Sequence, residues 1–313
     1  MDQACRNDVL RVIETLSSSY LQGKEKSIKL SVIALLGEGH LLLEDIPGLG
    51  KTTLALALSS SLGLSFGRVQ CTSDLLPSDI TGLSIFNREE SRFKFLPGPI
   101  FNNVVLVDEI NRAMPKTQSA LLEAMEERRV TVEGVTHQLP QPFVVIATQN
   151  PVEQVGTYPL PESQLDRFLI RTGLGYPPEQ LEKEIFKGGS IRGNIRNISP
   201  MISRDSILKA QEMVRKETHI ADNVVGYLFN IVALTRSHPL ILSGISTRGG
   251  INVADAAKAA AFLDGRNYVV PEDVKGLVVP VAAHRIILRA ENEGLNKEEV
   301  LTSIVRNVPV PLV

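Results

Sequence analysis

The segment LLLEDIPGLGKTTLALAL, residues 41–58, constrains the fold more than any other part of the chain. A short apolar run, typical of a buried strand, leads into a loop that ends Gly50-Lys51-Thr52, and an apolar helix pattern follows at once. The backbone N–H groups of such a loop and the positive end of the helix can surround a chain of phosphates. The segment therefore predicts a strand, a phosphate-binding loop and a helix in direct succession.

Within this loop, Lys51 is expected to neutralise the β- and γ-phosphates, and the Thr52 hydroxyl is expected to bind Mg²⁺. One position departs from the pattern GxxxxGK[ST], because Asp45 stands where the first glycine would be. Gly48 and Gly50 remain, so the turn is still feasible. We expect a nucleotide's phosphate chain to contact the loop and the first helical turn, at residues Asp45, Pro47, Gly48, Leu49, Gly50, Lys51, Thr52 and Thr53.

Two further strand ends carry polar side chains. In VVLVDE (104–109), Asp108 is expected to hold Mg²⁺ through its water shell, and Glu109 to polarise the attacking water as general base. Without the loop upstream, an acid here could simply cap a helix. In ATQNP (147–151), Asn150 is placed to hydrogen-bond the attacking water or the γ-phosphate, although an Asn before Pro is also ordinary turn chemistry.

The order of elements predicts an α/β fold. Apolar runs at 40–45, 68–71, 104–109, 143–150 and 168–173 indicate buried strands, and they alternate with helical patterns. Such alternation favours a doubly wound parallel sheet. After Pro177-Pro178 the pattern indicates helices at 179–187, 204–217, 222–236, 247–264, 271–283 and 296–307, and no comparable strand. We therefore expect an α/β nucleotide-binding core at 1–175 and an all-helical domain at 176–313, with Gly188–Ser199 as a connecting loop.

Composition excludes several classes of protein. The 313 residues carry a net charge of −2, so the chain lacks the basic excess of a strong nucleic-acid binder. Cys5 and Cys71 form no CxxC, and the five histidines show no metal-binding spacing, so neither disulfides nor zinc are expected. The N-terminus does not resemble a signal peptide, and no apolar run reaches the ~18 residues of a membrane span. We expect a cytoplasmic protein.

The same stretches carry a family resemblance. The chain resembles the MoxR family of AAA+ ATPases over most of residues 8–283, and family-like stretches include EDIPGLGKTTLA, QCTSDLLPSDITG, FLPGPIFNNVVLVDEINRA, FVVIATQNP and GTYPLPESQLDRFLIR. The resemblance implies an AAA+ P-loop core followed by a smaller helical lid, with ATP and Mg²⁺ as cofactors. It also implies that Lys51 and Thr52 belong to Walker A, Asp108 and Glu109 to Walker B, and that Asn150 is sensor 1.

The resemblance assigns the remaining site residues. Gly23 lies where the family's loop approaches adenine, and Arg167 matches an arginine that similar ATPases project into a neighbour's site, with Arg171 as the alternative. Arg248 matches sensor 2 of the lid, expected to act on the nucleotide of its own chain. Otherwise these arginines would be ion-paired surface residues or helix caps.

Three smaller expectations concern interfaces and inserts. Arg112 is a candidate for a subunit interface, whereas Met114 and Met125 are expected to serve core or interface packing. Residues 82–98 and 128–141 match the helix-2 insert and the pre-sensor-1 hairpin. The alternation in ERRVTVEGVTHQL, with Gly134 at a turn, independently indicates a hairpin.

The resemblance implies a homo-oligomeric ring, by analogy a hexamer, that hydrolyses ATP for chaperone-like remodelling or maturation of proteins, often with von Willebrand factor type A domain partners. Two alternatives stay open: the motor subunit of a chelatase-like complex, and a nucleotide-gated assembly scaffold in which hydrolysis matters little. Glu109 argues against the scaffold, because a pure switch needs no water-polarising base. A DNA helicase or loader has the least support, since no basic stripe is present.

Overall fold

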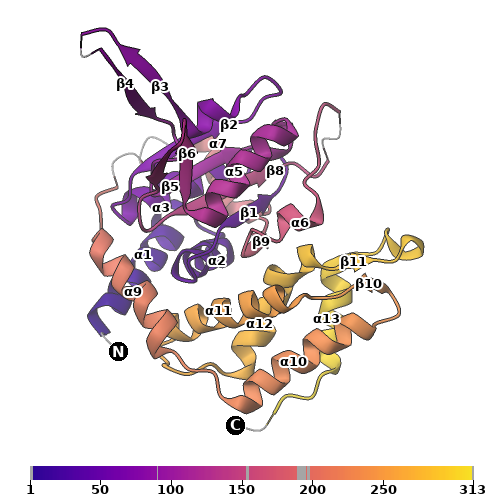
Figure 1. Cartoon of the computed structure of the whole chain (residues 1–313). Coiled ribbons are helices and arrows are strands. Elements are labelled where there is room, and N and C mark those ends of the chain that lie inside the picture. Colours follow the sequence, from indigo (N-terminus) through magenta and orange to yellow (C-terminus); the bar gives the residue numbers. More distant parts are fainter. Residues whose placement is uncertain (1–2, 90, 153–154, 189–194, 196–197, 312–313) are drawn as a thin grey trace.

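A five-stranded parallel sheet forms the centre of the first half of the chain in the computed structural model, which describes residues 3–89, 91–152, 155–188, 195 and 198–311 (Figure 1). The strand order is β2-β5-β8-β1-β9, and all four neighbouring pairs are parallel. The strands are β1 (Leu41–Glu44), β2 (Phe66–Gln70), β5 (Val104–Asp108), β8 (Val144–Gln149) and β9 (Ile170–Thr172). The predicted doubly wound sheet is confirmed.

Both faces of the sheet are buried, which explains why its strands are continuous apolar runs. Leu42 and Val105 point to one face and Leu41 and Leu106 to the other, and all four side chains are inaccessible to solvent. The first face packs against α4 (Pro77–Thr81) and α5 (Pro115–Glu127), and the second against α2 (Glu25–Leu36) and α3 (Lys51–Ser61). The other helical elements of this half are α1 (Gln3–Thr15), η1 (Leu16–Tyr20), η2 (Ile110–Arg112) and α6 (Glu162–Leu165).

Two antiparallel hairpins interrupt the α/β alternation at the places where inserts were expected. The first consists of β3 (Gly82–Asn87) and β4 (Arg92–Pro97), and the second of β6 (Arg129–Val132) and β7 (Val135–Gln138). Glu133 and Gly134 both have positive φ, as a two-residue hairpin turn requires. The hairpin predicted from ERRVTVEGVTHQL is confirmed.

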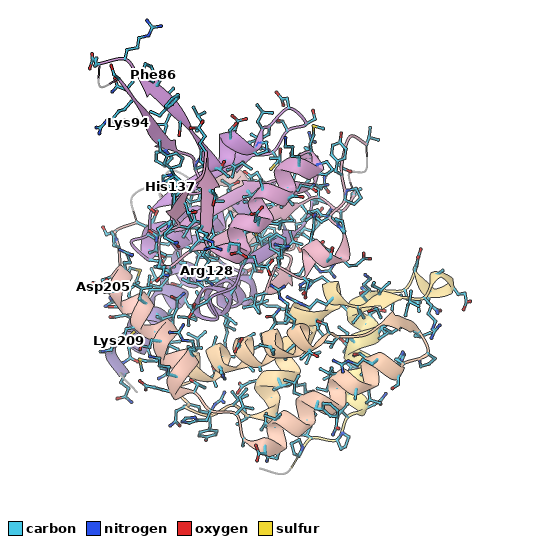
Figure 2. The ribbon with its side chains drawn as sticks, viewed as in Figure 1. Phe86, Lys94, Arg128, His137, Asp205 and Lys209 are labelled. Carbon is cyan, nitrogen blue, oxygen red and sulfur yellow. The ribbon has the colours of Figure 1, made fainter. Side chains whose placement is uncertain are left out.

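The β3–β4 hairpin projects from the body of the molecule (Figures 1 and 2). Phe86 near its tip is half exposed and contacts Phe93 edge to face, with ring centroids 5.4 Å apart. At its base, Phe95 stacks on His137 of the second hairpin at 3.9 Å. The two inserts therefore contact one another through an aromatic stack.

The second half of the chain is dominated by helices, and these match the predicted ranges closely. They are α7 (Glu179–Gly188), α9 (Arg204–Glu217), α10 (Asp222–Ser237), α11 (Thr247–Leu263), α12 (Pro271–Ala282), α13 (Lys297–Asn307), η3 (Ala283–Arg285) and η4 (Ala290–Asn292). Side-chain oxygens of Ser203, Ser246 and Asn296 cap α9, α11 and α13. Most of the expected loop Gly188–Ser199 lies outside the described residues.

One expectation for this half is corrected. It is not wholly helical, because β10 (Ile241–Ser243) pairs antiparallel with β11 (Ile287–Leu288). Strands of two and three residues are too short to show an alternating pattern in sequence. This pair lies next to α13 and away from the central sheet (Figure 1).

Helices of the two halves pack against each other. α9 lies against α1 and α2, and α11 also lies against α2. The Arg6 guanidinium donates hydrogen bonds to the carbonyl of Leu263 at the end of α11, at 3.0 and 3.1 Å. Among the described helices, none combines the length and apolarity that a bilayer crossing demands.

Candidate active site

The loop between β1 and α3 has the backbone that its glycines predict. Gly48 and Gly50 have φ of +90° and +96°, a region in which other residues are strained. A Cβ on Gly48 would meet nothing within 4 Å, so the backbone angle rather than crowding requires glycine there. α3 begins at Lys51, and the N–H groups of its first turn lack helical partners. The loop and helix end have the backbone geometry that suits an anion.

Asp45 explains the departure from the glycine pattern. Its carboxylate accepts hydrogen bonds from the backbone N–H groups of Leu174 and of Gly175, the latter at 3.1 Å. Its carbonyl accepts a hydrogen bond from the Lys51 ammonium group. Asp45 therefore anchors the loop to the chain that follows β9, and its carboxylate is already occupied by backbone donors.

Gly23 and Lys24 meet the same segment from the other side. Lys24 is buried, and its ammonium group donates to the carbonyls of Leu174, at 3.1 Å, and Gly175. Gly23 has φ of +73°, and a Cβ there would lie 2.6 Å from the ring of Pro178. The residue predicted near adenine thus contacts the start of the second half. Lys24 was not singled out from the sequence.

Asp108 lies at the carboxyl end of β5, where its side chain is only 10% exposed. Two guanidinium nitrogens of Arg68, on the neighbouring strand β2, both lie 2.8 Å from its Oδ2. The Thr148 hydroxyl, on β8, lies 3.5 Å from Oδ1. Arg68 was not predicted to belong to the site. It lies two residues before Gln70 and therefore points to the same side of β2.

Glu109 follows directly and has φ of +56°, an uncommon backbone for a residue other than glycine. Its N–H donates to the Thr148 hydroxyl at 2.9 Å. Its carboxylate forms an ion pair with Arg112, whose Nε lies 3.0 Å from Oε2, and accepts a hydrogen bond from the Gln70 amide at 3.4 Å. Arg112, considered for a subunit interface, thus contacts Glu109 of its own chain.

Lys51 and Asn150 lie at the same edge of the sheet as these acids. Burial lowers the pKa of Lys51, and the nearby carboxylates of Asp45, Asp108 and Glu109 partly offset that effect. Asn150 directly follows β8 at the same edge of the sheet, where its Oδ1 accepts from the N–H of Val152 at 3.2 Å. That bond is the turn chemistry considered as the alternative for Asn150, and it leaves the residue at the strand tip.

The oxygen atoms at this edge fit a magnesium ion. Thr52 supplies a hydroxyl and Asp108 a carboxylate, and Mg²⁺ in nucleotide sites is usually held by one or two such groups together with phosphate oxygens. Within the described ranges no cluster of three or more His, Cys, Asp or Glu side chains could hold a metal alone. The donor set therefore fits an ion that arrives with phosphates.

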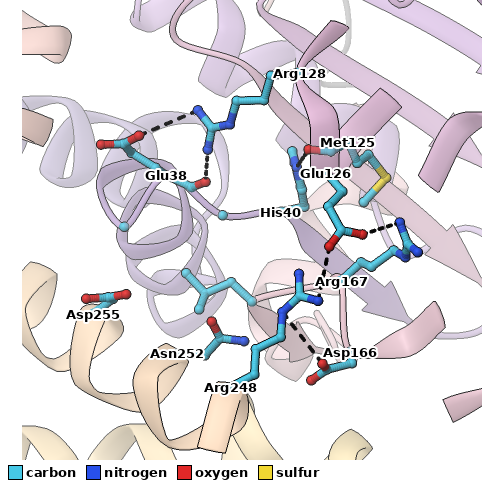
Figure 3. A pocket seen from close by; sticks show the side chains of 13 residues that line it. Glu38, His40, Met125, Glu126, Arg128, Asp166, Arg167, Arg248, Asn252 and Asp255 are labelled. Carbon is cyan, nitrogen blue, oxygen red and sulfur yellow. Dashed lines mark hydrogen bonds and ion pairs between the residues drawn. The ribbon is translucent and has the colours of Figure 1, made fainter. Parts of the chain in front are cut away.

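A cavity of about 170 Å³ (Figure 3) lies at the other end of the strands, beside the amino ends of β1 and β9. We call it the arginine cavity. It is lined by residues 37–40, by Met125, Glu126 and Arg128 at the end of α5 and just after it, by Asp166, Arg167 and Leu169, and by Arg248, Asn252 and Asp255 of α11. Arg167 and Arg248 both project into it, and each forms an ion pair with Glu126.

The alternative finger, Arg171, lies elsewhere. Its guanidinium pairs with Glu44 at 3.2 Å and with Glu298 at 3.6 Å, and its side chain is 18% exposed, against 29% for Arg167 and 52% for Arg248. Met125 is buried in the core as expected, whereas Met114 is half exposed at the start of α5.

Comparison with known proteins identifies the family. A model of the ATPase family associated with various cellular activities (AAA) matches residues 40–170, and an AAA lid domain model matches residues 233–304. Chaperone MoxR1 of Mycobacterium tuberculosis is 36% identical over 303 residues, covering 93% of this chain and 79% of that protein. The chain belongs to the MoxR family of AAA+ ATPases.

Further comparisons agree. Protein MoxR of Methylorubrum extorquens is 30% identical over 322 residues, covering 92% of this chain and 91% of that protein. The crystal structure of a Cytophaga hutchinsonii protein named as an ATPase superposes with a TM-score of 0.88 at 38% identity, covering 99% of this chain and 96% of that one. This MoxR-family protein is an ATP hydrolase built from an α/β core and a helical lid.

Proposed function

We propose that this MoxR-family ATPase hydrolyses Mg-ATP in a homo-oligomeric ring, where Arg167 and Arg248 of one subunit complete the site of the next. The observation that carries the proposal is the position of these arginines. Both lie in the arginine cavity at the amino ends of β1 and β9, whereas the phosphate loop follows the carboxyl end of β1. Within one chain, the length of β1 thus separates the arginines from the phosphate loop.

This position changes the role expected for Arg248. A sensor acting on its own chain's nucleotide should lie beside Lys51, but Arg248 shares Glu126 with Arg167 instead. We therefore propose that Arg248 acts in trans together with Arg167, and that Arg171, paired on both sides, is not the finger.

Within each site the chain's own residues supply the remaining chemistry. Gly48, Gly50 and the first turn of α3 would hold the phosphates, with Lys51 neutralising their charge and Gly23 beside the base. Thr52 and Asp108 would hold Mg²⁺, which offsets phosphate charge when bound. Glu109 would orient and deprotonate the attacking water, and Asn150 would help to position it. Glu109 must first leave Arg112 and Gln70.

We also propose a domain division, an oligomeric state and a cellular role for this ATPase. We place the core at 1–175 and the lid at 176–313, and we propose a hexamer that remodels protein clients in the cytoplasm, with von Willebrand factor type A domain proteins as partners. A relative named a chaperone, the near-neutral charge and two buried free cysteines support protein clients and a reducing compartment. No nucleic-acid partner is proposed.

Mixing variants tests the trans arrangement. Arg167→Ala and Glu109→Gln should each abolish most hydrolysis, and mixed rings should recover activity, because a Glu109→Gln subunit can supply Arg167 to a neighbour that keeps Glu109. Trans-acting arginines contribute ~10³–10⁵ in rate. The ATPase rate of wild type should also rise with protein concentration.

A second mixture decides how Arg248 acts. If Arg167 and Arg248 both act in trans, mixing Arg167→Ala with Arg248→Ala restores nothing, because every interface lacks one arginine. Recovery in this mixture would show that Arg248 serves its own chain's nucleotide. Absence of recovery with Glu109→Gln would contradict the trans role of Arg167.

Glu109→Gln also separates a motor from a scaffold. A motor should retain ATP and stall on its client, so affinity capture with ATP should enrich client proteins over wild type. A nucleotide-gated scaffold should keep its partner function after this change, and a chelatase motor should recover porphyrin-handling subunits. Either of the last two results would overturn the proposed remodelling role.

A further inference from the structure

Glu126 is the residue that joins the two arginines of the arginine cavity (Figure 3). It lies in the last turn of α5, and its two oxygens serve different partners. Oε2 lies 2.5 Å from NH1 of Arg167, and Oε1 lies 3.2 Å from NH1 of Arg248. Arg167 NH1 also donates to the carbonyl of Leu122, one turn earlier in α5, at 2.9 Å. One carboxylate therefore bridges an arginine of the core and an arginine of α11.

The charge network continues on the other side of Arg248. Its Nε lies 3.7 Å from Oδ2 of Asp166, and Oδ1 of Asp166 accepts from Nε of Arg285 at 2.7 Å. The Arg285 side chain is 2% exposed, and it also donates to the carbonyls of Asp166 and Phe168 at 2.9 and 2.8 Å. Positive and negative groups thus alternate from Arg167 through Glu126, Arg248 and Asp166 to Arg285.

Accessibility differs along this series. Arg285 is enclosed, Arg167 and Glu126 are 29% and 37% exposed, and Arg248 is 52% exposed. The buried end can fix the geometry while the exposed end remains reachable by another molecule. Two guanidinium groups repel each other at short range, and a shared carboxylate removes that repulsion while fixing their separation.

We propose that Glu126 is a positioning residue that holds Arg167 and Arg248 as one unit, so that both reach the same phosphate group on a neighbouring subunit. This inference rests on the proposed function. Glu126 acts through the arginines and does not itself contact the nucleotide. A neutral amide cannot replace it, because its single carbonyl oxygen accepts from one arginine while its NH₂ group faces the other.

The test is steady-state ATPase kinetics of assembled Glu126→Gln rings. We expect kcat to fall about tenfold with KM unchanged within about twofold, because ATP is held mainly by the other subunit's loop. In the Arg167→Ala background the same change should lower kcat by less than about threefold, since groups that act as a unit are not additive. Glu126→Asp, which keeps the charge but is one methylene shorter, should also lower kcat while the thermal midpoint stays near that of wild type.

Glu127→Gln is the matched control, because Glu127 lies next in the helix and pairs with the exposed Arg129. It should leave kcat and KM unchanged. The inference fails if Glu126→Gln keeps wild-type kcat, or if it lowers kcat equally with and without Arg167. If wild-type protein shows no assembly-dependent hydrolysis, the proposed function itself is contradicted, and that outcome is distinguishable because it needs no Glu126 variant.

Discussion

Arg68 and Arg112 each contact one of two consecutive acids, Asp108 at the end of β5 and Glu109 directly after it. Arg68 contacts Asp108, the residue expected to bind Mg²⁺, and Arg112 contacts Glu109, the expected base. Gln70 connects the two pairs, since its amide oxygen accepts from Arg68 and its amide nitrogen donates to Glu109. Arginine side chains thus pair with both acids, and a metal ion that binds Asp108 must compete with Arg68.

Arg68→Gln should therefore tighten Mg²⁺ binding. The Arg68 side chain is half exposed, and ion pairs of that kind contribute up to about 1 kcal/mol, so we expect a two- to fivefold gain, on the order of that energy. Mg²⁺ titration of the ADP-bound protein measures it, with Arg92→Gln on the projecting hairpin as control. Unchanged or weaker Mg²⁺ binding would mean that the ion does not displace Arg68.

Lys51 should make nucleotide binding sensitive to alkali. Its pKa lies below the ordinary 10.5 because burial disfavours the ammonium form, so its positive charge is lost at lower pH than that of an exposed lysine. ATP affinity, measured with Glu109→Gln to prevent turnover, should decline as the pH rises towards 10.5, and the decline should begin at a lower pH than the titration of an exposed lysine. Adding Lys51→Arg should flatten this decline, since arginine stays charged; an identical profile would exclude Lys51 as its source.

At the scale of elements, the sequence predicts those helices and strands whose formation depends on a local residue pattern. Apolar runs identify the five strands, and the Gly-Lys-Thr loop identifies where α3 starts. What it misses depends on contacts between distant segments. Nothing in the residues around Glu126 indicates that α11, more than 100 residues later, supplies its second partner, and Arg248 was accordingly expected beside the phosphate loop. β10 and β11 are too short to leave a pattern.

His40 joins two elements and should make them sensitive to acid. Its Nε2–H donates to the carbonyl of Met125 at the end of α5, and its Nδ1 accepts from the N–H of Val145 on β8. This arrangement needs a neutral ring, and burial lowers the pKa of His40 to about 4. The unfolded chain, with a pKa of about 6.5, takes up the proton first.

Stability should consequently fall as pH drops from about 6.5 to about 4, by up to ~3 kcal/mol from this group, and should be unaffected by it above that window. Urea denaturation between about pH 7.5 and about pH 5 measures the slope. His40→Gln should be less stable at neutral pH but should lose less stability on acidification. Parallel slopes for the two proteins would contradict the assignment.

At the scale of the whole molecule, Arg285 fastens the two halves together. It follows α12, and it donates to Asp166, Phe168, Leu169 and Val281. Three of these acceptors belong to the segment that leads into β9, which also carries Arg167. The buried guanidinium thus fixes the position of the helical half relative to the sheet.

Arg285→Met should cost about 3–5 kcal/mol of unfolding free energy, because it leaves Asp166 without its buried partner and several carbonyls without donors. Guanidinium denaturation followed by circular dichroism measures the loss. Arg306→Met on α13, whose side chain is exposed, should change stability by no more than about 0.5 kcal/mol. A similar small cost for both variants would show that Arg285 does not fasten the halves.

The separation of the phosphate loop from the arginine cavity has a consequence for symmetry. A contact that joins the loop of one copy to the cavity of another is heterologous, so a twofold dimer cannot satisfy it on both sides. Any open chain of copies ends with one nucleotide lacking arginines and one pair of arginines lacking a nucleotide. On the proposed function, only ring closure makes the number of complete sites equal to the number of subunits, so a single misfolded copy disables a neighbour as well as itself.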